Sequence, residues 1–150
     1  MENSSSIVKI KIKKLHADAI LPSYSHPGDA GMDVYSVEDV IIKAGERALV
    51  ATGLSMEFPA CHVALVWDKS GLAAKSGIKT MAGVIEHTYR GEYKIVMLNT
   101  SKADFEIKKG QKIAQVLIQP IMTAEVEEAQ ELSDTARGVG AFGSTGLEKK

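Results

Sequence analysis

A glycine-rich segment near the end of the sequence combines residue types that bind phosphate. The run Arg137-Gly-Val-Gly-Ala-Phe-Gly-Ser-Thr-Gly146 contains one cation, one aromatic ring and two hydroxyls. Its glycines let backbone N–H groups approach an anion closely, and the ring offers a stacking surface. A disordered Gly/Ser tail is the alternative for this segment taken alone. The run does not match the G-x-x-x-x-G-K-[ST] pattern of a P-loop, so it does not indicate an ordinary nucleotide triphosphatase.

A second segment, Asp68 to Ile78, lies where a predicted strand ends and a short predicted helix begins. Ser70 is the candidate N-cap of that helix, and Gly77 is the candidate stop. A helix N-terminus presents unpaired N–H groups and a partial positive charge, so Ser70 and Gly71 could receive a phosphate with Lys69 nearby. A simple capped turn is the alternative.

A third segment, Gly83 to Glu92, carries a carboxylate, an aromatic ring and a guanidinium between two predicted strands. If the segment is a hairpin, Glu86 and Tyr89 lie at its mouth, and a carboxylate beside a phosphate site can deprotonate an attacking water. A surface ion pair between Glu86 and Arg90 is the alternative. None of the four histidines has metal-ligand spacing.

Two more residues have polar groups within apolar surroundings. Asp33 could face a metal or phosphate region at the start of a strand, although a turn aspartate fits its segment equally well. Gln115 interrupts an apolar strand, and its amide needs partners that either a phosphate or the sheet backbone would supply.

The sequence predicts that these residues are carried mainly by short strands. Runs with β-branched residues recur between turn signals, a pattern typical of a sandwich, jelly roll or barrel. The predicted strands are Ile7–Lys13, Val40–Ile42, Arg47–Ala51, His62–Trp67, Tyr93–Leu98, Phe105–Lys108 and Lys112–Ile118. Two segments could be helical: Ser70–Ser76, and the acidic Ala124–Leu132, which we interpret as a solvated connector.

Length and composition indicate one globular domain with a tail. The chain has 150 residues, of which 45% are hydrophobic and 25% charged, and its net charge of −1 argues against a general nucleic-acid binder. The single cysteine, Cys61, cannot form an internal disulfide and is expected to pack in an apolar run. Neither a signal peptide nor a membrane-length apolar run is evident. We expect a cytoplasmic protein with a β domain over residues 1–132 and a flexible glycine-rich arm over residues 133–150.

Taken in order, five segments closely resemble the five motifs of the homotrimeric dUTP pyrophosphatase (dUTPase) family. They are AGMDVYS (30–36), SGLAAKSGI (70–78), AGVIEHTYRGE (82–92), KGQKIAQVLIQP (109–120) and RGVGAFGSTG (137–146). The resemblance implies an all-β, jelly-roll-like β-barrel with one short helix and a flexible carboxyl-terminal arm. It implies a homotrimer with active sites at its subunit interfaces. The implied reaction is Mg²⁺-assisted hydrolysis of dUTP to dUMP and diphosphate by an activated water, which would limit uracil in DNA and supply dUMP.

The resemblance also implies a role for each motif residue. Asp33 would hold Mg²⁺ through water, and Glu86 would be the catalytic base. The phosphate chain would be bound by Lys69, Ser70, Gly71 and Gln115. Uracil would be read by the backbone of Gly83, Val84 and Ile85, and Tyr89 would pack on the deoxyribose.

The arm would close over the site of a neighbouring subunit. Phe142 would stack on uracil, and the terminal phosphates would be contacted by Arg137, Gly143, Ser144 and Thr145.

Departures from the family pattern leave alternatives open. Glu86 replaces the usual aspartate of the third motif, Asp68-Lys69 replaces Pro-Arg before the second, Gln111 replaces an acidic residue of the fourth, and Ala141 replaces a glycine of the fifth. A dUTP-binding regulatory protein with weak or no hydrolysis is therefore one alternative. A dCTP deaminase is another, although the strand after the third motif lacks the glutamate of that relative.

Overall fold

The computed structural model describes residues 7–141, which form eleven short strands and one short helix. The all-β prediction with a single short helix is confirmed. No helix in these residues has the length and apolar character needed to cross a membrane. The elements are β1 (Lys11–Lys14), β2 (Met32–Tyr35), β3 (Val40–Ile42), β4 (Arg47–Ala51), β5 (Leu54–Glu57), β6 (His62–Trp67), α1 (Ser70–Ser76), β7 (Ile78–Met81), β8 (Val84–Glu86), β9 (Lys94–Asn99), β10 (Phe105–Ile107) and β11 (Lys112–Pro120).

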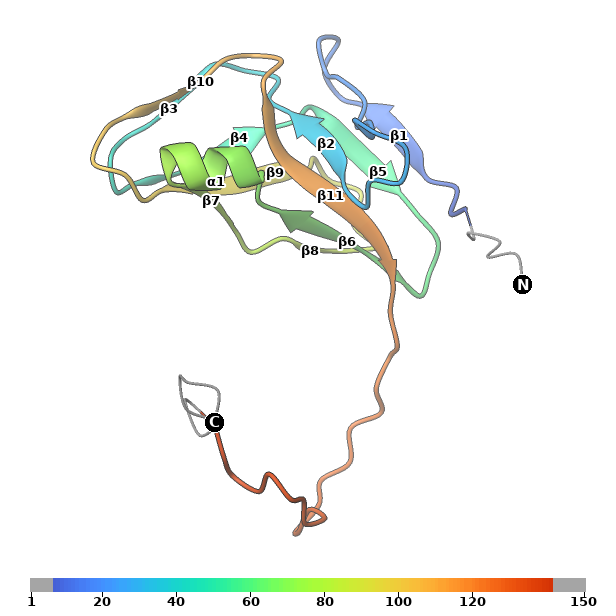
Figure 1. The fold of residues 1–150 in the computed structure, drawn as a ribbon. Coiled ribbons are helices and arrows are strands. Elements are labelled where there is room, and N and C mark those ends of the chain that lie inside the picture. The colour runs from blue at the N-terminus through green and yellow to red at the C-terminus, as the bar shows by residue number, and fades with distance from the viewer. Residues whose placement is uncertain (1–6, 142–150) are drawn as a thin grey trace.

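Strand β11 is the element that joins the predicted motifs in space. It lies in the largest described sheet, of order β2-β11-β6-β8, and pairs antiparallel with β2 on one side and with β6 on the other. Gln115 is in register with Asp33 on β2 and with Trp67 on β6. Figure 1 shows β11 running beside β2, with β6 and α1 close by. This pairing brings the first, second and fourth motifs together although they are far apart in the sequence.

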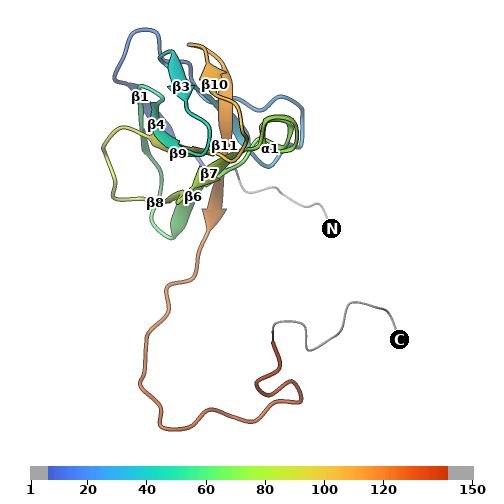
Figure 2. The same ribbon diagram turned by 90° about the vertical axis from the view of Figure 1, so that its left-hand side faces the viewer.

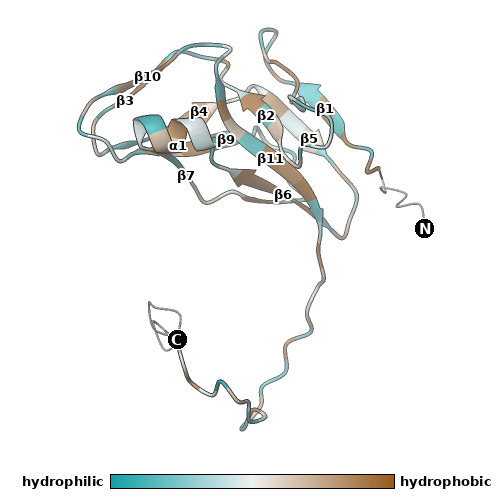
Figure 3. Cartoon of the chain, viewed as in Figure 1, coloured by the Kyte–Doolittle hydropathy of each residue, from teal (hydrophilic) through white to brown (hydrophobic). Residues whose placement is uncertain are grey.

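The other sheets complete the β domain. Strands β4, β9 and β7 form a three-stranded sheet, while β1 pairs with β5 and β3 with β10. Along β9, inward Ile95, Met97 and Asn99 alternate with more exposed neighbours, as expected for a strand with one buried face. Figure 3 shows the contrast between hydrophilic β1 and hydrophobic β6.

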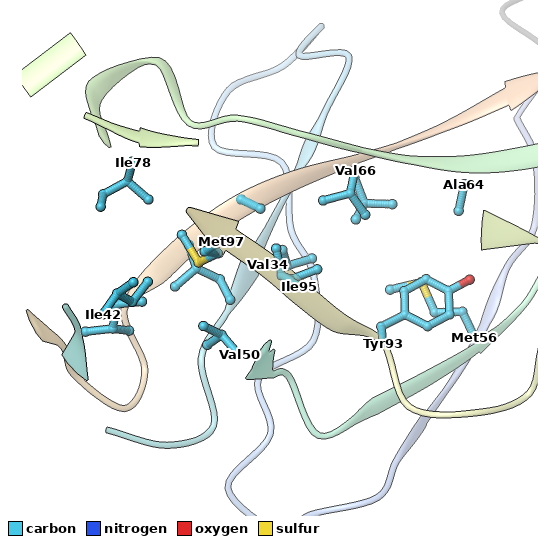
Figure 4. Close-up of a cluster of buried hydrophobic side chains, with 14 of the residues drawn as sticks. Val34, Ile42, Val50, Met56, Ala64, Val66, Ile78, Tyr93, Ile95 and Met97 are labelled. Carbon is cyan, nitrogen blue, oxygen red and sulfur yellow. The ribbon is translucent and has the colours of Figure 1, made fainter. Parts of the chain in front are cut away.

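One hydrophobic cluster forms the core between these sheets. Figure 4 shows Tyr93 and Met56 at one end of the cluster, with Ile42 and Ile78 at the other. Burying an aliphatic side chain of this size contributes about 1.5 to 3 kcal/mol relative to leaving it exposed. The Tyr93 ring is 1% exposed, and its hydroxyl has no hydrogen-bond partner within the described part of the chain. Burial raises the pKa of Tyr93 to about 12, so this hydroxyl is neutral.

The chain leaves the sheets after β11 ends at Pro120. Residues 121–141 contain no helix or strand, so the acidic stretch Ala124–Leu132 is not helical. Figures 1 and 2 show this segment running away from the β domain. The side chains of Met122, Val126 and Leu132 are 89–96% exposed, so they have almost no packing partner within one chain.

Several local predictions were wrong in detail. Strand β1 begins at Lys11 rather than Ile7, since its pairing with β5 starts at the Lys11–Glu57 pair. Cys61 is exposed rather than packed, with a positive φ of 60° in the turn before β6. Strands β5 and β7 were not predicted.

Candidate functional site

Asp33 is a buried carboxylate whose two oxygens are both occupied by cations. It is 3% exposed on β2. The Lys69 Nζ lies 2.5 Å from Oδ1, and the Lys112 Nζ lies 2.6 Å from Oδ2, which also accepts a 2.7 Å hydrogen bond from Ser25 Oγ. Burial alone would raise the pKa of Asp33, but the bonds from Lys112, Lys69 and Ser25 outweigh it and lower the pKa to about 2. Asp33 is therefore an anion at neutral pH, held between two ammonium groups.

An open cavity of about 550 Å³ surrounds Asp33, and its lining includes Asp29, Gly31, Lys69 and Gln115. The Gln115 Nε2 donates a 2.9 Å hydrogen bond to the carbonyl of Asp68, so this amide links β11 to the turn before the helix. A Cβ at residue 31 would collide with the Gln115 Oε1, so a larger residue there would displace this amide. The cavity thus combines a paired carboxylate, a lysine and an amide, and two of these groups are carried by the paired strands β2 and β11.

The short helix α1 begins beside this cavity. Its N-cap is Lys69, with φ −81° and ψ 117°, and no side chain caps it. The prediction of Ser70 as the N-cap was wrong, because Ser70 is already the first helical residue. The first intrahelical bond runs from Ala73 N to Lys69 O, so the N–H groups of Ser70 and Gly71 precede the helical ladder and can bind an anion. Both residues are exposed.

A second open cavity, of about 650 Å³, lies along β8 and the following turn. Gly83, Val84, Ile85, Glu86 and Tyr89 all line it. Gly83 has φ 110°, and its carbonyl accepts a 2.8 Å hydrogen bond from the N–H of Val66. A Cβ at residue 83 would lie 2.8 Å from the Val66 carbonyl oxygen, so only glycine lets β8 approach β6 this closely.

Tyr89 forms a fixed aromatic wall of the second cavity. Its hydroxyl donates a 3.1 Å hydrogen bond to the carbonyl of Glu92, and its ring centroid is 6.1 Å from that of buried Tyr93. A Cβ on Gly91 would collide with the Tyr89 ring. The ring is 45% exposed and can therefore pack against a ligand.

Glu86 ends β8 with its carboxylate available for chemistry. Glu86 is exposed, and within residues 7–141 its carboxylate makes no hydrogen bond or ion pair. The surface pair with Arg90 is not formed. The Arg90 Nε instead lies 3.9 Å from Glu57 Oε2, and its Nη1 donates to the carbonyl of His87. Glu86 can therefore accept a proton from water at the edge of the cavity.

One chain does not bring all the predicted site residues together. The two cavities share no lining residue: Asp33, Lys69 and Gln115 line one, while Glu86 and the 83–85 strand line the other. Arg137 lies beyond β11, where its Nε donates to the Gly140 carbonyl at 2.8 Å. Phe142, Gly143, Ser144 and Thr145 lie outside the described residues.

Lys112 and Ser25 are site residues that the sequence reasoning missed. Lys112 could have been found as a cation at the start of the strand that carries Gln115. Ser25 has no comparable signal, because it reaches Asp33 through a loop. No group of three or more His, Cys, Asp or Glu side chains that could hold a metal occurs in the described ranges.

Comparisons with known proteins show the family to which the chain belongs. The dUTPase family model matches residues 17–146. The deoxyuridine 5'-triphosphate nucleotidohydrolase of Clostridium acetobutylicum is 50% identical over 145 residues, which are 95% of this chain and 100% of that protein. The Staphylococcus bacteriophage 80alpha dUTPase, solved with dUpNHpp, is 28% identical with a TM-score of 0.88 and covers 93% of this chain and 99% of its own.

A third protein has a similar fold. A variant of the dUTPase from phage phi11 of S. aureus, whose structure reveals the coordination of a structural Mg(II) ion, is 24% identical. Its TM-score is 0.78, over 84% of this chain and 99% of its own. These likenesses confirm the jelly-roll-like β fold. The chain belongs to the dUTPase family.

Proposed function

We propose that this protein hydrolyses dUTP to dUMP and diphosphate by attack of a Glu86-activated water on the α-phosphate. The observation that carries the proposal is the Glu86 carboxylate, which has no partner among residues 7–141 and lies at the edge of the cavity lined by Gly83, Val84 and Ile85. The names of relatives at 50% and 48% identity support dUTP as the substrate. Glutamate carries the same carboxyl group as aspartate, so the substitution in the third motif preserves the chemistry of the base.

The uracil and the sugar would lie along β8. This strand is at the end of the described sheet order β2-β11-β6-β8, so one side of its backbone is free to bind a ligand. The Gly83 carbonyl is bound to Val66, but backbone N–H and C=O groups on the outer edge of the 83–85 segment can pair with the polar edge of a pyrimidine. The Tyr89 ring, fixed by its hydroxyl bond, would pack on the deoxyribose and exclude a 2′-hydroxyl.

The phosphate chain would be bound at the start of α1. Lys69 supplies a cation, while Ser70 and Gly71 supply N–H groups that the helix does not use. Gln115 would assist through its amide. Lys112 would keep the buried Asp33 paired when Lys69 turns toward a phosphate, so that no buried charge is left without a partner.

Mg²⁺ fits this site as an ion that arrives with the triphosphate. The described residues form no all-protein cage, and Mg²⁺ usually takes one or two carboxylates together with phosphate oxygens and retained waters. Asp33 would hold it through water, with the nearby Asp29 lining the same cavity. When bound, the ion would neutralise charge on the phosphate oxygens.

A homotrimer with sites between subunits would unite the two cavities. The separate linings of the cavities and the exposed apolar residues after β11 support this assembly. Residues 133–150 would form an arm over a neighbouring site, beyond a β domain of residues 1–132. Arg137, Gly143, Ser144 and Thr145 would contact the terminal phosphates, and Phe142 would stack on uracil.

Two alternatives receive less support. The substitutions at Glu86 and Lys69 suggest a regulatory protein that binds dUTP without hydrolysis, but glutamate keeps the carboxylate of aspartate and lysine keeps the cation of arginine. A deaminase would need a glutamate in the strand after the third motif, and β9 reads KIVMLN. The exposed thiol of Cys61, unpaired in the described residues, supports a reducing, cytoplasmic location, where the enzyme would limit uracil in DNA.

The direct test is diphosphate release from dUTP, dCTP, dTTP and UTP in the presence of Mg²⁺. We expect turnover of dUTP alone. Glu86→Gln should lower kcat at least ~100-fold while leaving dUpNHpp binding nearly intact, since only the base is removed. Glu106→Gln, an exposed carboxylate paired with Lys108, is the matched control and should behave as the wild type. If the wild-type protein binds dUTP tightly but releases no diphosphate, the proposal that it hydrolyses dUTP is wrong.

A further inference from the structure

Asp68 ties the turn before α1 to the strand that follows the helix. Its Oδ1 accepts hydrogen bonds from the Thr80 N–H at 2.5 Å and from the Thr80 hydroxyl at 2.6 Å. Its Oδ2 accepts a 3.0 Å bond from the Lys79 Nζ. Burial opposes ionisation of Asp68, but the Thr80 and Lys79 bonds prevail and lower its pKa. The carboxylate therefore closes the loop of residues 68–80, which contains the whole helix.

The backbone of Asp68 is fixed as well. Its carbonyl accepts the 2.9 Å bond from Gln115 Nε2, so residue 68 is bound to β11 through its backbone and to β7 through its side chain. No side-chain cap holds the start of α1. Together with the Lys69–Asp33 ion pair, the Asp68 bonds fix the start of this helix. Lys69 and Ser70 are the next two residues in the chain.

We propose that Asp68 is a positioning residue that places Lys69 and the N–H groups of Ser70 and Gly71 against the phosphate chain of the substrate. The proposal rests on the function proposed above. The family motif that this segment resembles has proline at this position, which restricts the backbone through its ring. In this chain, hydrogen bonds to Thr80 would provide that restriction.

Three variants test the proposal, with the KM and kcat for dUTP and the Kd for dUpNHpp as readouts. Asp68→Ala removes every side-chain bond, whereas Asp68→Asn keeps an oxygen acceptor for Thr80. Asp104→Ala is the matched control, because Asp104 likewise accepts from a lysine, Lys43 at 2.8 Å, and from a backbone N–H, Ala44 at 3.0 Å. Asp104 lines neither of the two cavities of the site.

We expect Asp68→Ala to raise the KM for dUTP and the Kd for dUpNHpp about tenfold or more, since small misplacements of binding groups are costly. Asp68→Asn should stay within about threefold of the wild type, and Asp104→Ala should lower the Tm without changing KM or Kd. If Asp68→Ala does not fold, Thr80→Val, which removes one bond, should raise both constants about threefold.

A Kd and KM for Asp68→Ala equal to those of Asp104→Ala would overturn the proposal, because Asp68 would then act on stability alone. The same holds if a folded Thr80→Val variant binds as the wild type does. Failure of the proposed function has a different signature: the wild type releases no diphosphate. The Kd for dUpNHpp still tests Asp68 in that case.

Discussion

At Asp33, two ammonium groups meet one buried carboxylate. Lys69 and Lys112 each bind a different oxygen, so the cluster of three residues carries a net positive charge. A positive site beside a helix N-terminus attracts a polyanion. Lys69 has its side chain 30% exposed, whereas Asp33 has 4%, so the lysine can reach a ligand in the cavity while the carboxylate stays beneath it.

The lowered pKa of Asp33 predicts a loss of stability in acid. Its pKa falls from an ordinary value of 3.8 to about 2 in the folded protein, so its stabilising contribution is present above pH 3.8 and is lost as the pH falls toward 2. We expect urea unfolding of the wild type to lose about 2 kcal/mol more than Asp33→Asn between pH 5 and pH 2. If the free energy of unfolding changes with pH equally in the two proteins, the pKa of Asp33 is not lowered in the folded protein.

The Tyr93 hydroxyl predicts a stabilising substitution. It is buried with no partner in the described part of the chain, and an unsatisfied buried hydroxyl costs about 1 to 3 kcal/mol. Tyr93→Phe should therefore raise the free energy of unfolding by about 1 kcal/mol, as measured in urea. A lower free energy of unfolding would reveal a hydrogen bond that this hydroxyl makes in the assembled protein.

At the scale of elements, β-branched runs bounded by turn residues predicted several strands well. The bounds of Val40–Ile42, Arg47–Ala51 and His62–Trp67 match the structure, as do those of α1. Strand β5 (LSME) was missed because it contains no β-branched residue, although apolar and polar residues alternate along it. Ser55 is nevertheless buried, since its hydroxyl donates to the Arg90 carbonyl at 2.7 Å. A long-range partner of this kind leaves no local signal.

The candidate site was likewise predicted only in part from the sequence. The motifs predicted that Asp33, Lys69 and Gln115 share a site, and β11 brings them together. Lys112 is recognisable in the sequence as a cation at the start of that strand, but its contact with Asp33 depends on the pairing of β11 with β2, whose register shifts between Lys112 and Ala114. Cys61 looked like a core residue within its apolar run, but it occupies a left-handed turn position that only the fold defines.

The two ends of α1 predict opposite effects of the same substitution. Gly77 has φ 65°, and a Cβ there would lie 2.9 Å from the Thr100 hydroxyl oxygen, so Gly77→Ala should lower the free energy of unfolding by more than about 1 kcal/mol. At Gly71, a Cβ would meet no atom within 4 Å, so Gly71→Ala should be neutral or raise the free energy of unfolding by up to about 1 kcal/mol. Urea unfolding of both variants measures the difference. Equal effects would contradict the left-handed C-cap.

At the scale of the whole molecule, the site residues are divided between two cavities. The proposed base and the proposed pyrimidine cavity lie on β8, whereas the residues proposed to bind phosphate lie at β2, α1 and β11. Residues 121–141 run away from the sheets (Figure 2). The apolar side chains of Met122, Val126 and Leu132 in this segment are exposed. A site assembled from neighbouring copies of the chain explains both features.

Subunit mixing tests directly whether the site is shared between chains. Glu86→Gln and Lys69→Ala should each be nearly inactive alone. When they are unfolded together in urea and refolded as a mixture, some sites should pair an intact Glu86 from one chain with an intact Lys69 from another. Random assembly predicts that about a quarter of the sites recover.

Diphosphate release from dUTP measures the recovery. A site shared between chains predicts activity near a quarter of the wild-type value in the co-refolded mixture. Variants that are refolded alone and then combined without exchange should be no more active than each variant by itself. A co-refolded mixture as inactive as its components would contradict a site shared between chains.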